Sequence, residues 1–163
     1  MTRLTIISGG QVGVDQAALS WAISHGIPHG GWCPKGRLAA DGVIPARYQL
    51  KETTTRFYAQ RTERNVVDSD GTVIFTNDGR LQSGTRLTAE LAIHHGKPLL
   101  EIHDLTLSPG ARLAEFIRDH QIQRLNVAGS RVGVGNLVEM TLDEAAVELG
   151  LIPIPTPCQP CPP

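Results

Sequence analysis

Features that mark several protein classes are scarce or missing in this 163-residue chain. No apolar run approaches the length of about 20 residues that a membrane-spanning helix needs, which argues against a membrane protein. The net charge is only −1, so no overall basic field favours nucleic-acid binding. The three cysteines are an odd number, which fits a reducing compartment. Since Thr2 and Arg3 lead straight into a short strand without a signal peptide, we expect a cytoplasmic protein.

Metal-binding and nucleophile motifs are also missing. The six histidines are scattered, and His94 and His95 are adjacent on a predicted helix, so they point to different faces. Cys158 and Cys161 supply two ligands, whereas a structural zinc site takes four, although zinc shared between subunits remains an alternative. Neither a G-x-S-x-G elbow nor an H-E-x-x-H motif occurs. We therefore expect no protein-ligated metal and assign no catalytic residue.

The most informative feature present is a glycine-rich loop between an apolar strand and a helix. It comprises Gly9, Gly10, Gln11 and Gly13, with Asp15 at the position of a helix N-cap. Glycines let the backbone approach a ligand closely, and a helix N-terminus offers unpaired N–H groups to an anion. The loop is neither a P-loop nor a strict dinucleotide fingerprint. It predicts a phosphate site, and the alternative is an ordinary tight turn.

Two further junctions resemble this first one. The segment 125–135 repeats Gly-x-x-Val-Gly-Val after an apolar strand, and the segment 72–92 joins another strand to a helix through Ser83 and Gly84. In an open parallel sheet all three junctions fall on the carboxyl edge, where such folds bind ligands. Their recurrence favours a ligand site over an isolated turn.

Strands alternate with helices along the chain, which predicts a doubly wound, mostly parallel α/β sheet with helices on both faces. The predicted strands are Leu4–Ile7, Ile27–Trp32, Thr72–Phe75, Leu99–Ile102 and Leu125–Ala128. The predicted helices are Asp15–Ser24, Phe57–Val67, Thr85–His95, Pro109–His120 with Ser108 as N-cap, and Asn136–Leu149. We expect one domain over residues 1–152, followed by a proline-rich tail over residues 153–163.

A basic stretch lies between the first two predicted helices. From Lys35 to Arg64 there are seven cations and three acids, a local excess of 7 − 3 = +4. The segment from Cys33 to Tyr48 has no clear periodicity, and loops of this length in compact domains are often functional. We expect Lys35 and Arg37 to supply positive charge to an anionic ligand. A solvated basic surface is the alternative.

With these motifs assembled, the chain resembles the molybdenum-cofactor carrier proteins. These belong to a Rossmann-like nucleotide-binding group that includes the Lonely Guy phosphoribohydrolases. The matching stretches are residues 7–19, 26–37, 41–48, 58–66, 68–72, 83–88 and 125–129. The resemblance implies a Rossmann-like protein that binds a phosphorylated ligand, the molybdenum cofactor, which is a pterin with a phosphate tail. It also implies a homodimer or homotetramer.

The motifs and the resemblance together predict one set of ligand-binding residues. These are Gly9, Gly10, Gln11, Gly13, Asp15, Lys35, Arg37, Ser83, Gly84, Thr85, Thr88, Asn126, Gly129 and Ser130.

The resemblance also bears on catalysis. The Lonely Guy motif Gly-Gly-x-Gly-Thr-x-x-Glu carries a glutamate that helps to cleave an N-glycosidic bond, and here Thr88 stands at that position. We therefore expect a carrier, storage or sensor protein. The alternative is a phosphoribohydrolase acting on a nucleoside monophosphate, for which Asp15, Glu63 and Glu90 are the candidate carboxylates. A third interpretation is an interaction module that uses the proline-rich tail.

Overall fold

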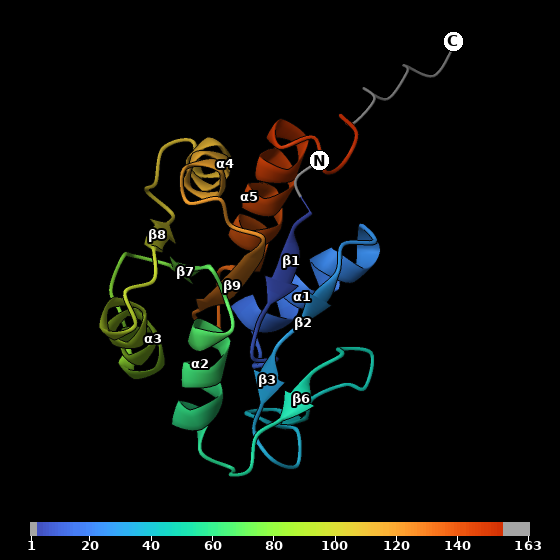
Figure 1. The fold of residues 1–163 in the computed structure, drawn as a ribbon, viewed down its shortest axis with the longest axis vertical. Coiled ribbons are helices and arrows are strands. Elements are labelled where there is room, and N and C mark those ends of the chain that lie inside the picture. The colour runs from blue at the N-terminus through green and yellow to red at the C-terminus, as the bar shows by residue number, and fades with distance from the viewer. Residues whose placement is uncertain (1–2, 155–163) are drawn as a thin grey trace.

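The computed structural model describes residues 3–154, which form one α/β domain around a parallel sheet (Figure 1). The sheet has the strand order β2-β1-β9-β7-β8, and every neighbouring pair is parallel. Its strands are β1 Thr5–Ile7, β2 His29–Gly30, β7 Gly71–Thr76, β8 Leu99–His103 and β9 Arg124–Gly129. The predicted parallel sheet is confirmed.

Five helices cover the two faces of the sheet. They are α1 Val14–Ser24, α2 Tyr58–Val67, α3 Ser83–His94, α4 Pro109–Asp119 and α5 Gly135–Glu148. Helices α1, α5 and α4 lie in one layer, and α2 and α3 lie side by side in the other (Figure 1). The connection from β1 through α1 leads to one edge of the sheet and that from β7 through α3 to the other. Because such crossovers are right-handed, α1 and α3 lie on opposite faces. The fold is therefore doubly wound and Rossmann-like.

The main hydrophobic core lies between the sheet and the layer formed by α1, α4 and α5. Ile6, Phe75 and Val127 point into it from three adjacent strands and are fully buried. Alternate strand positions face α2 and α3 and are more polar: Asn126 Nδ2 donates to Thr72 Oγ1 at 3.2 Å, and both residues are buried. Each large apolar side chain in the core contributes about 1.5–3 kcal/mol of stability. The face of the sheet beneath α2 and α3 therefore carries hydrogen-bonding side chains such as those of Asn126 and Thr72.

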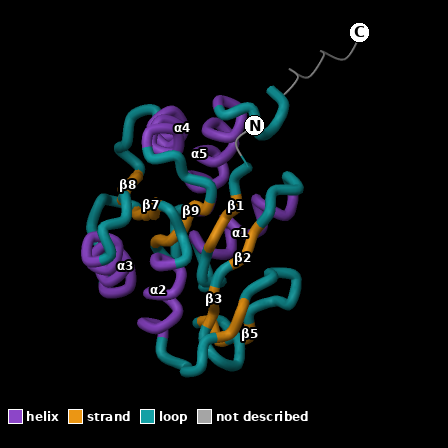
Figure 2. The backbone as a smooth tube through the Cα atoms, in the orientation of Figure 1, coloured by secondary structure: helices purple, strands orange, loops and turns teal. Residues whose placement is uncertain are grey.

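The region between β2 and α2 differs from the predicted single strand Ile27–Trp32. The chain turns at Gly31, where φ is +131°, so β2 pairs with β1 and the next strand leaves the sheet. Two short strand pairs and their loops follow (Figure 2). Their strands are β3 Trp32–Cys33, β4 Leu38–Ala39, β5 Gly42–Val43 and β6 Lys51–Glu52, with β3 parallel to β6 and β4 antiparallel to β5. The prediction of one continuous strand was wrong because the sheet ends at this turn.

Helix starts also differ from the predicted ones. Helix α1 begins at Val14 with Gly13 as N-cap, so the prediction that Asp15 caps this helix was wrong. Ser108 does stand at the N-cap of α4 with Pro109 in the first turn, but its side chain makes no capping hydrogen bond. Helix α3 begins at Ser83, two residues before the predicted start, which brings its first turn closer to the end of β7.

No helix within residues 3–154 is both long and apolar enough to span a membrane. Most of the predicted tail, including Cys158 and Cys161, lies outside the described residues. The boundary at residue 152 therefore stays a prediction.

Candidate functional site

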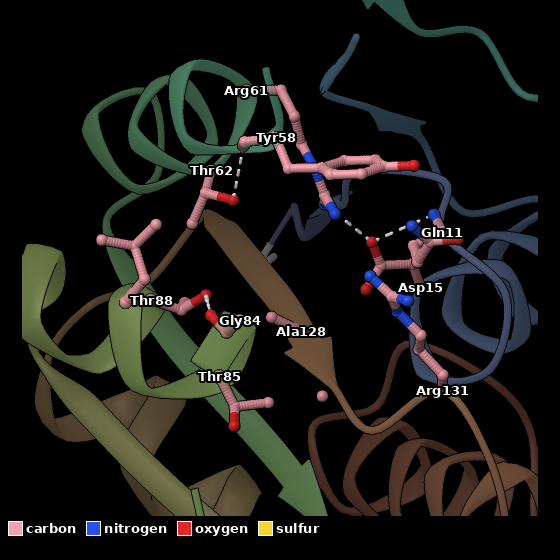
Figure 3. Close-up of a pocket in the computed structure, with 12 residues that line it drawn as sticks. Gln11, Asp15, Tyr58, Arg61, Thr62, Gly84, Thr85, Thr88, Ala128 and Arg131 are labelled. Carbon is pink, nitrogen blue, oxygen red and sulfur yellow. Dashed lines mark hydrogen bonds and ion pairs between the residues drawn. The ribbon is translucent and has the colours of Figure 1, made fainter. Parts of the chain in front are cut away.

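A pocket opens at the carboxyl ends of β1, β9 and β7, where the connections to α1 and α3 diverge (Figure 3). It encloses about 530 Å³ of space, including its open mouth. Its lining residues are Gln11, Asp15, Tyr58, Arg61, Thr62, Gly84, Thr85, Leu87, Thr88, Ala128, Gly129 and Arg131. Open α/β sheets bind ligands at such divergence points.

The glycine loops after β1 and β9 pack backbone against backbone beside this pocket. Val14 N–H donates to Ser130 O at 3.2 Å, and Ser130 N–H donates to Phe75 O at 2.9 Å. At Gly13 φ is +86°, and a Cβ there would come within 2.5 Å of Ser130 O. A Cβ on Gly129 would collide with Phe75 O. Glycine is therefore required at both positions by the close approach of the loops.

The first turn of α3 forms a second wall of the pocket. No side chain caps this helix, and the N–H groups of Ser83, Gly84 and Thr85 donate to no acceptor among the described residues. Thr85 Oγ1 donates to Gln82 O and Thr88 Oγ1 donates to Gly84 O, each at 3.0 Å. The hydroxyl protons are thus engaged by backbone, and the available donors on this wall are amides. Amides at a helix N-terminus favour an anion.

A buried ion pair forms the wall opposite α3. Arg61 NH1 from α2 donates to Asp15 Oδ2 at 3.0 Å, and Gln11 N–H donates to the same oxygen at 3.2 Å. Asp15 is only 4% exposed. Burial raises the pKa of Asp15 because water no longer solvates the charge, whereas Arg61 and the backbone N–H groups of Gln11 and Gly9 lower it. Burial is the largest of these effects, so the carboxyl pKa lies above its ordinary value of 3.8.

Two arginines flank the Tyr58 ring at the mouth of the pocket. The guanidinium carbons of Arg61 and Arg131 lie 5.7 Å and 5.9 Å from the ring centroid. Both distances allow a cation–π attraction. Tyr58 is 40% exposed, so an entering molecule would meet the ring and both cations (Figure 3). The pocket therefore combines positive charge, free amides and one carboxylate.

The structure brings most of the predicted residues to this region. Six of them line the pocket: Gln11, Asp15, Gly84, Thr85, Thr88 and Gly129. Gly9 and Asn126 line a smaller neighbouring cavity, which also contacts Arg61 and Thr88. Gly10, Gly13, Ser83 and Ser130 belong to the adjoining loops and helix start. The three predicted junctions do meet at one edge of the sheet.

Lys35 and Arg37 are not among the residues that line this pocket. Lys35 is exposed. Arg37 donates hydrogen bonds to the carbonyl oxygens of Ile44, Pro45, Tyr48 and Leu50, at 2.9–3.3 Å. Its guanidinium group therefore holds the segment 44–50 in place.

The cations in the pocket are instead Arg61 and Arg131, which the sequence prediction missed together with Tyr58, Thr62, Leu87 and Ala128. For Arg131 the signal was available, because it directly follows Ser130 in the second glycine loop. For Arg61 the sequence offered only membership in the basic stretch. Within residues 3–154, no group of three or more His, Cys, Asp or Glu side chains could hold a metal ion.

Replacing Asp15 with asparagine should change how stability depends on pH. Because the pKa of Asp15 is higher in the folded state than its ordinary 3.8, the folded protein binds more protons in the interval between the two values. The carboxyl group therefore opposes folding above its folded-state pKa, and this opposition disappears as the pH falls to about 3.8. Asp15→Asn has no titrating group at this position, so its difference from the neutral carboxyl adds a nearly constant offset.

The expected result is that the unfolding free energy of the wild type rises relative to that of Asp15→Asn between pH 7 and pH 4. Urea titrations of both proteins at several pH values measure this difference. If the unfolding free energy of the wild type instead falls relative to that of Asp15→Asn as the pH decreases, the folded state favours the charged carboxylate, contrary to this expectation.

Comparison with known proteins gives two matches. The circularly permutated YpsA SLOG family matches residues 6–148. A crystal structure from Syntrophus aciditrophicus SB, named "Putative molybdenum carrier protein", shares 43% sequence identity with a TM-score of 0.84. The alignment covers 88% of this chain and 95% of that one. No curated protein matches. These matches confirm the resemblance inferred from the sequence, and the chain belongs to the circularly permutated YpsA SLOG family.

Proposed function

We propose that this protein binds a phosphate-bearing small molecule in the pocket at the ends of β1, β9 and β7 and acts as its carrier, store or sensor. The observation that carries the proposal is the uncapped first turn of α3, which faces the pocket opposite Arg131 and Arg61. The name of the relative from Syntrophus aciditrophicus supports the molybdenum cofactor as the ligand. The proposed location is the cytoplasm.

The residues present suit the two parts of such a ligand. The phosphate would accept hydrogen bonds from the backbone N–H groups of Gly84 and Thr85, with Arg131 supplying positive charge from the opposite wall. Each hydrogen bond to a charged group contributes about 1.5–3 kcal/mol. The planar pterin would lie toward Tyr58, whose exposed ring is the aromatic surface at the mouth. Gly129 and Ala128 leave the floor over β9 free of bulky side chains.

Filling the pocket at Gly84 should abolish binding without disturbing the fold. A Cβ at Gly84 meets no heavy atom within 4 Å, so the side chain of Gly84→Val would project into open space beside the free amides. We expect at least a tenfold loss of affinity for adenosine 5′-monophosphate and for molybdenum cofactor, measured by calorimetry, with little change in melting temperature.

Gly135→Val is the matched control for this prediction. Gly135 also lies in the first turn of a helix with nothing within 4 Å, but it does not line the pocket. Equal binding by both variants and the wild type would contradict the proposed site. A wild type that binds no phosphorylated ligand would contradict the proposed function.

A phosphoribohydrolase is the second candidate function, and one observation favours retaining it. Of the three candidate carboxylates, Asp15 lines the pocket. Glu63 instead contacts His95 Nε2 at 3.1 Å, and Glu90 is exposed on α3. Thr88 lies in the pocket wall where the Lonely Guy motif would have its glutamate. A carboxylate with a raised pKa can act as a general acid or base, so Asp15 is the residue on which such activity would depend.

We expect no hydrolysis when the protein is incubated with adenosine 5′-monophosphate and its N6-substituted derivatives. Thr88 stands where the Lonely Guy motif has its glutamate, and none of the α3 residues that line the pocket carries a carboxylate. Chromatography for free base and ribose 5-phosphate measures the outcome. Release that Asp15→Asn abolishes would replace the carrier proposal with the hydrolase.

We also propose a homodimer or homotetramer, with the proline-rich tail outside its main interface. An apolar groove between α2 and α3 supports this proposal. Its lining is mostly apolar, with Phe57, Ala59, Leu87 and Leu91 next to the polar Thr55, Gln60 and Glu63, and Phe57 is 75% exposed. A two-fold interface buries the same patch on both subunits, and an exposed aromatic ring in a mostly apolar groove supplies the apolar surface for such a patch.

Light scattering at micromolar concentration should therefore give at least twice the chain mass of 17.6 kDa. Removing residues 156–163 should leave this mass unchanged, whereas Phe57→Asp should lower it because a charge would be buried in the groove. A monomeric wild type would contradict the proposed assembly without bearing on the ligand pocket.

A further inference from the structure

The pocket contains a carboxylate, although its proposed ligand carries a phosphate. Asp15 lies in the pocket wall and is 4% exposed. An ionised carboxylate repels a nearby phosphate, and burying it removes favourable hydration. Anion binding alone therefore gives no reason for an acid at this position.

The contacts of Asp15 leave part of its hydrogen-bonding capacity unused. The two hydrogen bonds within 3.5 Å, from Arg61 NH1 and Gln11 N–H, both go to Oδ2, and Gly9 N–H is a weaker third contact to the carboxyl. An ionised carboxylate has about four acceptor positions on two oxygens and no donor. The remaining acceptor positions of Asp15, including those of Oδ1, suit a hydrogen-bond donor rather than a phosphate oxygen.

A structural role for Asp15 does not require its charge. The loop contact with Gln11 N–H needs only an acceptor oxygen, which the amide of asparagine also provides. The ion pair with Arg61 is a weak source of stability because burial of both groups offsets their attraction. The full acceptor character of a carboxylate is useful where a second donor approaches from the pocket.

The pocket is polarised across its width. Figure 3 shows Asp15 on one side near Arg61 and Arg131, and Gly84 and Thr85 on the other, with Ala128 between the two sides. One wall offers acceptor positions and the other offers free N–H donors. A ligand that spans the pocket can therefore place different groups against the two walls.

We propose that Asp15 is a specificity-determining residue that accepts a hydrogen bond from an uncharged donor of the ligand, while the ligand's phosphate lies against the first turn of α3. The ligand class is therefore a phosphate ester whose organic part bears a hydroxyl group or a ring N–H. This inference rests on the proposed phosphate-binding function. It goes beyond that function because it predicts which phosphate esters the pocket prefers.

The first experiment uses the wild-type protein and ligands that differ by one donor. Calorimetry compares adenosine 5′-monophosphate with its 2′-deoxy and 3′-deoxy analogues, which tests a sugar hydroxyl. Guanosine 5′-monophosphate and its N1-methyl analogue test a ring N–H. Removing the donor that Asp15 recognises should lower the affinity at least fivefold. Equal affinities across both series would overturn the inference.

The second experiment compares Asp15→Asn with the wild type. Asparagine keeps an acceptor oxygen for Arg61 and Gln11 N–H but removes the negative charge and one acceptor oxygen. The preference for the donor-bearing ester should shrink to less than twofold. The affinity for inorganic phosphate should rise at least twofold, because the repulsive charge is gone. If Asp15 had only a structural role, Asp15→Asn would instead weaken the binding of both the donor-bearing ester and inorganic phosphate.

Glu90→Gln is the matched control. It removes one carboxylate charge from the exposed surface of α3, outside the pocket lining, and should leave both affinities unchanged. If Asp15→Asn changes the affinity for inorganic phosphate and the affinity for donor-bearing esters by the same factor, the inference fails while the phosphate site stands. If the wild type binds molybdenum cofactor but none of these esters, the inference fails while the proposed function stands. If it binds neither the cofactor nor any of these phosphates, both fail.

Discussion

Two backbone hydrogen bonds join the ends of β1, β7 and β9, and the candidate site depends on them. Ser130 N–H donates to Phe75 O, and Val14 N–H donates to Ser130 O, so the pairing of the strands continues into their loops. Glycine at position 13 permits this approach because any Cβ would meet Ser130 O. Backbone groups have fewer degrees of freedom than side chains. Loops held in this way keep the helix start and the pocket floor in fixed positions before any ligand enters.

The ion pair between Arg61 and Asp15 connects the two helical layers across this pocket. Arg61 comes from α2 and Asp15 from the first turn of α1, on the other side of the sheet. Arg61 Nε is buried and has no hydrogen-bond partner among the described residues. A buried donor without a partner lowers stability by about 1–3 kcal/mol. Natural proteins concentrate such unfavourable groups at functional sites, so this arginine is better explained by ligand binding than by folding.

The sequence predicted the parallel sheet, its five helices and the meeting of three junctions at one edge, because strand and helix periodicity carry that information. It did not predict the turn at Gly31 or the start of α1 at Val14, since both depend on contacts outside the local segment. Six of the predicted residues line the pocket. Arg61 was missed because it is 46 residues from Asp15 in sequence, and only the packing of α2 brings them together.

Arg61 lines the pocket and Arg37 does not, and the physical reason for this difference applies to other proteins as well. Both lie in the same basic stretch. Arg37 lies in an irregular segment whose carbonyl oxygens lack strand or helix partners, and it donates to four of them. Arg61 projects from a helix, where the carbonyl oxygens are already paired with backbone N–H groups. Its guanidinium group must therefore find its partners elsewhere, across the pocket. An arginine on a helix that faces a pocket is thus a better candidate for anion binding than one in a long loop.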